Sequence, residues 1–225
     1  MWQHQAMPSA SAQNTAHDLP ALIRGLPERS QRLYREAEAA WDREQGLLLF
    51  AYGSLIWKPG FDPAEQGPAL VHGFHRALRL RSLVNRGNAQ QAGLVLCLLS
   101  GGSCRGLFYR VAPTQSAAVL CELWAREMVV GSYEPRWLLC QTPQGPRPAL
   151  SFTLPRQSPG LQAHLDDAAL LHILRHAQGR YGSTLDYLQR TVISLRSHGI
   201  CDAELERQLT LAERHGLLKE AAQSC

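Results

Sequence analysis

No stretch of this sequence is apolar enough to cross a membrane. Its longest apolar runs have the length of single strands, well short of the about 18 residues that a spanning helix needs. The first part of the chain is polar and lacks the apolar segment of a secretory signal. These absences predict a soluble, cytoplasmic protein without a membrane partner.

Charge of one sign is nowhere concentrated. The chain has 23 Lys and Arg against 19 Asp and Glu, a formal net charge of only +4, and no run of five like charges. Proteins that bind nucleic acids usually carry a basic patch or stripe. The even spread therefore gives no indication of a nucleic-acid partner, and it leaves the oligomeric state open.

Cysteine and histidine show no metal-binding or disulfide pattern. There are six cysteines but no C-x-x-C pair, and no histidine pair stands at zinc-like spacing beside them. Cys97 lies within an apolar run, as expected of a small core residue. His172 and His176 are four residues apart but lack the H-E-x-x-H context, which favours a pair on a helix surface. We predict neither a metal site nor a disulfide framework.

The composition that remains is that of an ordinary globular protein, with 45% apolar and 19% charged residues. We divide the chain into an N-terminal extension, residues 1–45, and one folded domain, residues 46–225. Residues 1–18 are expected to be disordered because they contain few large apolar groups. The segment 26–45 has apolar residues at i, i+4 and i+8 and predicts an amphipathic helix.

Strand patterns come first in the domain, and most helix patterns follow. The expected strands are 47–50, 69–83, 93–99, 104–111, 136–141 and 149–154. The expected helices are 113–130, 166–176, 183–197 and 202–218. The sequence Gly-Gly-Ser at 101–103 predicts a hairpin turn between the third and fourth strands. This order predicts an α+β fold and not a doubly wound sheet.

The first strand runs directly into the turn Tyr52-Gly53-Ser54-Leu55, within the sequence LLLFAYGSLIWKPG. A glycine after a buried strand lets backbone N–H groups approach a ligand closely. Successive N–H groups in such a turn can form an anion-binding nest or an oxyanion hole. Ser54 lacks the G-x-S-x-G context of a nucleophilic serine. The alternative is an ordinary tight turn.

Helical spacing places a carboxylate beside an apolar stripe in the segment 113–131. The stripe contains Leu120, Trp124 and Met128, and Glu127 falls on it or at its edge, whereas Glu122 falls off it. Burial raises the pKa of a carboxyl group toward the range that suits a general base. The alternative is that Glu127 reaches water at the helix end or pairs with Arg126.

Two further segments contain candidate binding residues. Arg86 lies in a polar loop, where it could clamp a substrate carboxylate, although a surface arginine is the plainer interpretation. The sequence GRYGSTLDYL at 179–188 reads as a glycine-containing loop that enters a helix, with Ser183 or Thr184 as its cap. Tyr187 could belong to the core or point its hydroxyl group into a site.

Six motifs resemble those of the ChaC family of γ-glutamylcyclotransferases, in chain order over residues 46–212. They are LLLFAYGSLIWKP, VHGFHRALRLR, NRGNAQQAGLVLCL, RGLFYRV, ELWAREMVVGSYEPRWL and GRYGSTLDYL. The chain departs from the family pattern at a few loop positions, with Asn88 for Thr, Ala92 and Arg180 for Pro, and Thr184 for Asn.

The resemblance implies a small, partly closed β-barrel flanked by helices, acting on glutathione without a metal or cofactor. It implies that the turn of Tyr52, Gly53, Ser54 and Leu55 binds the γ-glutamyl group through its backbone, and that Glu127 is the catalytic acid and base. Arg86 and Tyr187 are predicted to bind substrate. Three alternatives stay open: another γ-glutamyl substrate, an inactive binding protein of this fold, or a serine hydrolase using Ser54.

Overall fold

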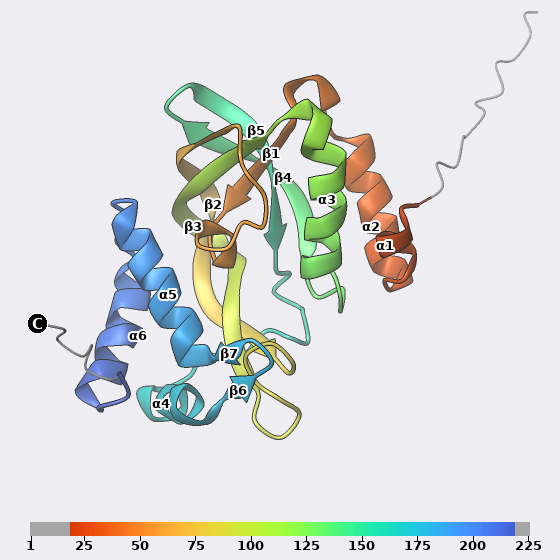
Figure 1. Ribbon diagram of the computed structural model, residues 1–225. Helices are drawn as coiled ribbons and strands as arrows, with labels where there is room; N and C mark the ends of the chain where they lie inside the picture. Colours follow the sequence, from red (N-terminus) through yellow and green to blue (C-terminus); the bar gives the residue numbers. More distant parts are fainter. Residues whose placement is uncertain (1–18, 219–225) are drawn as a thin grey trace, which may run out of the picture.

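The computed structural model describes residues 19–218 and shows a β-barrel with helices on two sides (Figure 1). The predicted disorder at residues 1–18 lies outside the described residues. None of the helices in the described range is long and apolar enough to cross a bilayer. Within the same range, no group of three or more His, Cys, Asp or Glu side chains is placed to hold a metal ion.

Five strands close the barrel in the order β1-β3-β2-β4-β5, and β3 also pairs with β5. Their bounds are Leu47–Ala51 for β1, Glu65–Ser82 for β2, Gly93–Val111 for β3, Glu134–Thr142 for β4 and Gly145–Thr153 for β5. Strand β1 is buried at all five positions, as its unbroken apolar run predicts. Cys97 is fully buried, which confirms its prediction as a core residue.

The predicted hairpin at 101–103 is wrong, because β3 runs through it as one strand of 19 residues. Gly101 and Gly102 have φ angles of 100° and 74°, and on the neighbouring strand Gly73 has a φ of 82°. Pairing resumes on both sides, with His72 opposite Ser103 and Phe74 opposite Ser100. Two residues of β3 thus face one residue of β2. The glycines form a β-bulge that bends the strand pair, and not a turn.

Three helices cover one side of the barrel: α1 (Ala21–Arg24), α2 (Glu28–Ala39) and α3 (Pro113–Glu127) (Figure 1). Trp124 of α3 is fully buried and meets the rings of Tyr34 and Phe152 edge-on, at centroid distances of 5.3 and 5.8 Å. Its indole N–H donates to the Ser30 carbonyl at 2.9 Å. The predicted amphipathic helix in the segment 26–45 is therefore present, ends at Ala39, and packs on α3.

The other side carries α4 (Asp167–His176), α5 (Thr184–Ser197) and α6 (Ala203–Arg214) (Figure 1). Side chains of Asp166, Ser183 and Asp202 cap these three helices at their N-termini. The last helix is shorter than predicted, because Gly216 has a φ of 65°, beyond the helical range. A two-residue ribbon, β6 (Gln178–Gly179) with β7 (Gly182–Ser183), leads into α5. His172 and His176 form an exposed pair on α4, as predicted.

Candidate active site

The turn 52–55 leaves the barrel directly after β1 and enters a short 3₁₀ helix, Ser54–Ile56. The Tyr52 hydroxyl group donates to the Phe152 carbonyl at 2.7 Å, and the Tyr52 carbonyl accepts a hydrogen bond from the Arg76 guanidinium. Tyr52 is therefore fixed at both its side chain and its backbone. This rigid attachment holds the turn at the end of β1, as the motif predicted.

Gly53 packs closely against two neighbouring residues. A Cβ atom at this position would lie 3.2 Å from the Tyr187 hydroxyl oxygen and 3.5 Å from the Leu96 Cβ. The Tyr187 hydroxyl in turn accepts a hydrogen bond from the Leu96 N–H at 3.4 Å. The sequence left open whether Tyr187 belongs to the core or points its hydroxyl group into a site. Both are true, since its ring is buried and its hydroxyl group lies against the turn.

Glu127 is the last residue of α3, and its side chain is 18% exposed. Burial raises the pKa of its carboxyl group, although the neighbouring Arg126 guanidinium acts in the opposite direction. The Arg126 Nε lies 3.0 Å from the Glu127 Oε1. The two interpretations offered by the sequence are therefore both present: the carboxylate is desolvated and it has an arginine neighbour. Glu122 is exposed, as predicted.

Three buried tyrosines surround Glu127 closely enough to interact with it electrostatically: Tyr52, Tyr133 and Tyr187. Burial raises the pKa of each phenol, to about 12 for Tyr187. The Tyr133 hydroxyl group donates to the Leu96 carbonyl at 2.9 Å. These tyrosines stay neutral at physiological pH. They supply polar groups beside Glu127 without adding a charge that would stabilise its ionised form.

Arg126 connects the carboxylate to the turn. Its Nη2 donates to the Ser54 hydroxyl oxygen at 3.0 Å, and its Nη1 donates to the Lys58 carbonyl at 2.7 Å. One guanidinium thus joins Glu127 to both ends of the segment 54–58. A guanidinium cannot take the Ser54 proton, so this contact gives no support to the serine-hydrolase alternative.

Arg86 is buried, so the interpretation as a surface arginine is wrong. Its Nη1 donates to the Asp186 Oδ2 at 2.9 Å, and its guanidinium lies 5.1 Å from the centre of the Tyr187 ring. The carboxylate that Arg86 holds in this structure is therefore the protein's own. Direct contact between Arg86 and substrate stays a prediction, whereas its support of Tyr187 is visible in the geometry.

The glycines of the 179–188 motif permit a close backbone approach. A Cβ atom at Gly179 would lie 2.5 Å from the Arg86 backbone nitrogen. Ser183 caps α5, because its hydroxyl oxygen accepts from the Asp186 N–H at 3.0 Å. Thr184 has another role, since its hydroxyl oxygen accepts from the Leu94 N–H at 2.9 Å. The motif thus fastens α5, and with it Tyr187, to the loop that carries Arg86.

Sequence reasoning did not select Tyr133 as a site residue. It lies after α3, six positions beyond Glu127, and reaches the site only because the barrel places β3 beside it. The signal was its presence in the motif ELWAREMVVGSYEPRWL, which was used for the resemblance and not for the site. The structure does bring together five of the predicted site residues: Tyr52, Gly53, Ser54, Glu127 and Tyr187.

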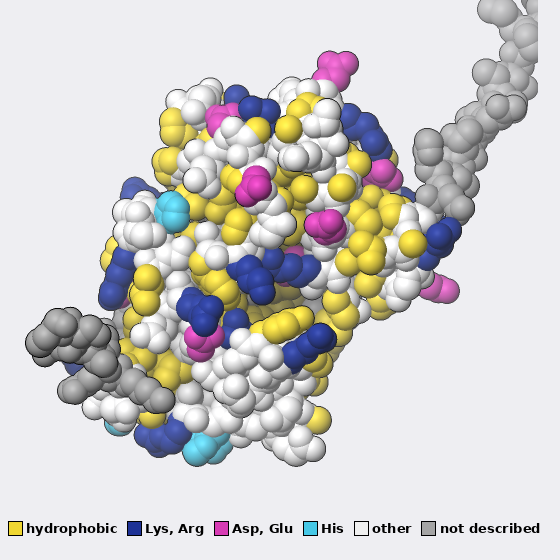
Figure 2. Space-filling view, in the orientation of Figure 1, with side chains coloured by type: hydrophobic (Ala, Val, Ile, Leu, Met, Phe, Trp, Pro, Cys, Tyr) yellow, Lys and Arg dark blue, Asp and Glu magenta, His cyan; other side chains and the backbone are white. Residues whose placement is uncertain are grey.

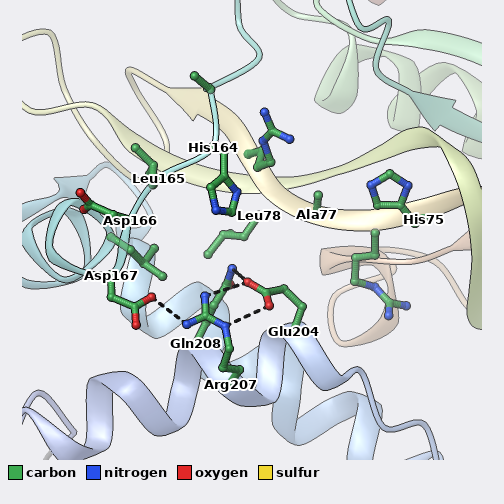
Figure 3. A pocket seen from close by; sticks show the side chains of 14 residues that line it. His75, Ala77, Leu78, His164, Leu165, Asp166, Asp167, Glu204, Arg207 and Gln208 are labelled. Atoms are coloured by element: carbon green, nitrogen blue, oxygen red, sulfur yellow. Dashed lines mark hydrogen bonds and ion pairs between the residues drawn. The ribbon is translucent and has the colours of Figure 1, made fainter.

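A concave region borders α6, and we call it the α6 groove (Figure 3). It encloses about 530 Å³ between β2, the segment 163–167 and α6. None of the predicted site residues lines it. Its ionisable lining residues are His75, Arg76, Arg79, His164, Asp166, Asp167, Glu204 and Arg207.

The closed barrel and its flanking helices define a protein with the γ-glutamylcyclotransferase fold. A yeast structure described as a γ-glutamyl cyclotransferase specific to glutathione matches with a TM-score of 0.66 and 20% identity, covering 76% of this chain and 97% of that one. A second yeast structure matches with a TM-score of 0.64 and 17% identity, covering 76% and 99%. The predicted α+β barrel flanked by helices is therefore confirmed.

The chain belongs to the family described as ChaC-like protein, whose model matches residues 47–214. It is similar to the glutathione-specific gamma-glutamylcyclotransferase of Escherichia coli strain K12, with 29% identity over 176 residues and 76% of each chain covered. It is also similar to the human glutathione-specific gamma-glutamylcyclotransferase 1, with 30% identity over 151 residues, 65% of this chain and 68% of that one. The resemblance noted from the motifs is confirmed.

Proposed function

We propose that this protein cleaves glutathione into 5-oxoproline and cysteinylglycine, with Glu127 as the general acid and base. The observation that carries the proposal is a half-buried carboxylate of raised pKa, joined through Arg126 to the turn after β1. Membership of the ChaC-like family and the names of the relatives support glutathione as the substrate. A cytoplasmic location stays a prediction from the sequence.

The reaction is intramolecular and consumes no water. The α-amine of the γ-glutamyl group starts as an ammonium, and Glu127 accepts one of its protons. The free amine then attacks the γ-carbonyl carbon and closes a five-membered ring. Glu127 returns a proton to the amide nitrogen as the carbon–nitrogen bond to cysteine breaks, and the second proton that the attacking nitrogen loses on ring closure passes to the released amine, which leaves as an ammonium. Proton transfer by one positioned carboxyl group contributes about 10²- to 10⁴-fold to the rate.

The turn contributes by orienting the substrate. The γ-glutamyl chain is flexible, and closing it so that the amine meets the carbonyl costs entropy. Well-oriented intramolecular reactions reach effective molarities of roughly 10⁵–10⁸ M. The backbone N–H groups of residues 53–55 are proposed to hold the γ-glutamyl group and the oxygen on which negative charge develops. Removing one such donor typically costs about 3–4 kcal/mol.

The test is to incubate the purified protein with glutathione in water labelled with heavy oxygen and to analyse products by mass spectrometry. Cyclisation gives unlabelled 5-oxoproline and an equal amount of cysteinylglycine. Hydrolysis would instead give labelled glutamate and would contradict the proposed reaction. Product from another γ-glutamyl amine but none from glutathione would overturn the substrate assignment. No product from any γ-glutamyl compound would favour the inactive binding protein.

A further inference from the structure

Two cations beside the candidate active site stand without acidic partners. Lys58 and Arg180 are exposed, and in residues 19–218 neither forms an ion pair. Their neighbours differ, because Arg126 pairs with Glu127, and Arg86 and Arg190 both pair with Asp186. Figure 2 shows Lys and Arg side chains gathered around a hollow in this face, between the barrel and the C-terminal helices. The positive charge of Lys58 and Arg180 is thus available to a ligand.

Both cations lie against one aromatic ring. The Lys58 Nζ is 5.6 Å from the centre of the Tyr181 ring, and the Arg180 Cζ is 5.3 Å from it. The Tyr181 side chain is 54% exposed. Cation–ring contacts hold the two charges near each other without neutralising them. A cluster of this kind presents a flat apolar surface with positive charge beside it.

The backbone of this cluster is fixed to the walls of the active site. The Arg180 N–H donates to the Val84 carbonyl at 2.8 Å, and the Tyr181 N–H donates to the Asn85 carbonyl at 2.9 Å. On the other side, the Lys58 carbonyl accepts from Arg126, which pairs with Glu127. The cluster therefore lies at the rim of the site that contains Glu127. It is held by the same segments that hold Arg86 and the turn 52–55.

We propose that Lys58, Arg180 and Tyr181 bind the terminal carboxylate of the leaving peptide, which rests on the proposed function. With the γ-glutamyl group at Glu127, cysteinylglycine must extend outward from the site. In an extended chain, the carboxylate of cysteinylglycine lies about 7 Å from its cysteine nitrogen. The two cations match that charge, and the Tyr181 ring can support the peptide backbone. This subsite selects γ-glutamyl peptides that end in a carboxylate over γ-glutamyl amines that carry no such group.

The test compares glutathione with glutathione whose glycine carboxylate is converted to a carboxamide. The variants are Lys58→Met, Arg180→Met and the double variant, all at exposed positions. Each single variant is expected to raise the KM for glutathione about two- to fivefold, and the double variant roughly tenfold, with kcat unchanged. The KM for the carboxamide is expected to be high in the unaltered protein and to change little in the variants.

Arg43→Met is the control, because Arg43 is also an exposed cation over a ring, 5.0 Å from the centre of Trp41, but it pairs with Glu38 at 2.8 Å and belongs to the segment before β1. It is expected to leave both KM values unchanged. Equal effects of Lys58→Met and Arg180→Met on the two substrates, or no effect on either, would overturn the subsite while leaving the proposed function intact. Failure of the unaltered protein to release 5-oxoproline from either substrate would overturn the proposed function itself.

Discussion

Two regions of this molecule bring carboxylates and arginines together around a hollow, and they differ in how the charges are balanced. In the α6 groove, Arg207 binds both Glu204 and Asp167, at 3.0 and 2.7 Å (Figure 3). Gln208 adds a hydrogen bond to Glu204 at 2.9 Å. These hydrogen bonds, above all those from Arg207, lower the pKa of Glu204.

The candidate active site has the opposite balance. Glu127 has one arginine contact, its other close polar neighbours include three neutral tyrosines, and burial raises its pKa. A carboxylate that is fully paired keeps its charge and holds structure together, whereas one that is desolvated and only partly paired can exchange a proton. The charges of the α6 groove are therefore compensated more fully than the charge of Glu127. We expect incomplete compensation of a buried carboxylate, and not concavity, to mark the reactive group of this protein.

The largest effect expected from this comparison is on the two glutamates. Glu127→Gln removes the proposed proton acceptor but keeps the size of the side chain, so kcat is expected to fall by about 10²- to 10⁴-fold while the fold is kept. Glu204→Gln changes the same chemical group in the α6 groove and is expected to leave kcat within about twofold, since a surface ion pair contributes little. Release of 5-oxoproline from glutathione measures both.

A Glu127→Gln variant that keeps half of the unaltered rate would contradict the assignment of the acid and base. Equal losses in the two variants would show that the difference in charge balance does not decide function. Circular dichroism of each variant confirms that the comparison is made between folded proteins.

A smaller effect is expected from crowding the turn. Gly53→Val adds a branched side chain where a Cβ alone would be 3.2 Å from the Tyr187 hydroxyl oxygen. Overpacking of this kind costs about 1–3 kcal/mol, so kcat/KM for glutathione is expected to fall roughly 10- to 100-fold, mainly through KM. Gly25→Val is the control, because no atom lies within 4 Å of a Cβ at Gly25. Unchanged kinetic constants in Gly53→Val would contradict a substrate-holding turn.

Arg76 connects the two regions and sharpens the comparison. Its side chain lines the α6 groove, is 2% exposed, and pairs with Asp202 at 2.7 Å, while its Nε holds the Tyr52 carbonyl. Arg76→Met is expected to lower the free energy of unfolding by about 3 kcal/mol, because it leaves a partly buried carboxylate without its partner. It should also raise the KM, because the Tyr52 carbonyl loses its donor.

Asp202→Asn separates these two effects of Arg76. Asparagine caps a helix as well as aspartate does, so α6 keeps its cap while the ion pair is lost. We expect lower stability in urea with kinetic constants unchanged. If Arg76→Met and Asp202→Asn had the same KM, the hydrogen bond to the Tyr52 carbonyl would have no part in substrate binding.

The smallest effect is expected on the stability of the groove. The side chains of Arg207 and Glu204 are 45% and 51% exposed, so solvent screens their attraction. Glu204→Gln is expected to lower the free energy of unfolding by about 0.2–1 kcal/mol, and less at high salt. Urea unfolding at two salt concentrations measures it. A loss as large as that of Arg76→Met would show that the groove is more than a surface ion-pair network.

The sequence predicted most of the barrel because its strands carry their own pattern. The run Leu47–Ala51 is apolar throughout and is buried throughout. The failure at 101–103 has a physical reason, since Gly-Gly-Ser suits a turn and a bulge equally well. The neighbouring strand β2 determines that a bulge forms here, because Gly73 also adopts a positive φ and pairing between the strands continues on both sides.

The candidate site was predictable where it depends on local geometry. Helical spacing alone placed Glu127 against an apolar stripe, and the structure has it there, 18% exposed. The partners of Arg86 and the position of Tyr133 were not predictable in this way. Asp186 is 100 residues from Arg86, and Tyr133 meets Leu96 only through closure of the barrel. Contacts at such separations follow from topology, which no local pattern contains.

The most direct test of the central claim is the pH dependence of kcat/KM for glutathione on the acid side. A general base must be ionised, so activity falls as the pH drops through its pKa. Because burial raises the pKa of Glu127, the fall is expected to be centred above the ordinary glutamate value of about 4.3, and to be absent from the residual activity of Glu127→Gln. A fall centred at the ordinary value, or one that persists in Glu127→Gln, would contradict the claim that this incompletely compensated carboxylate transfers the proton.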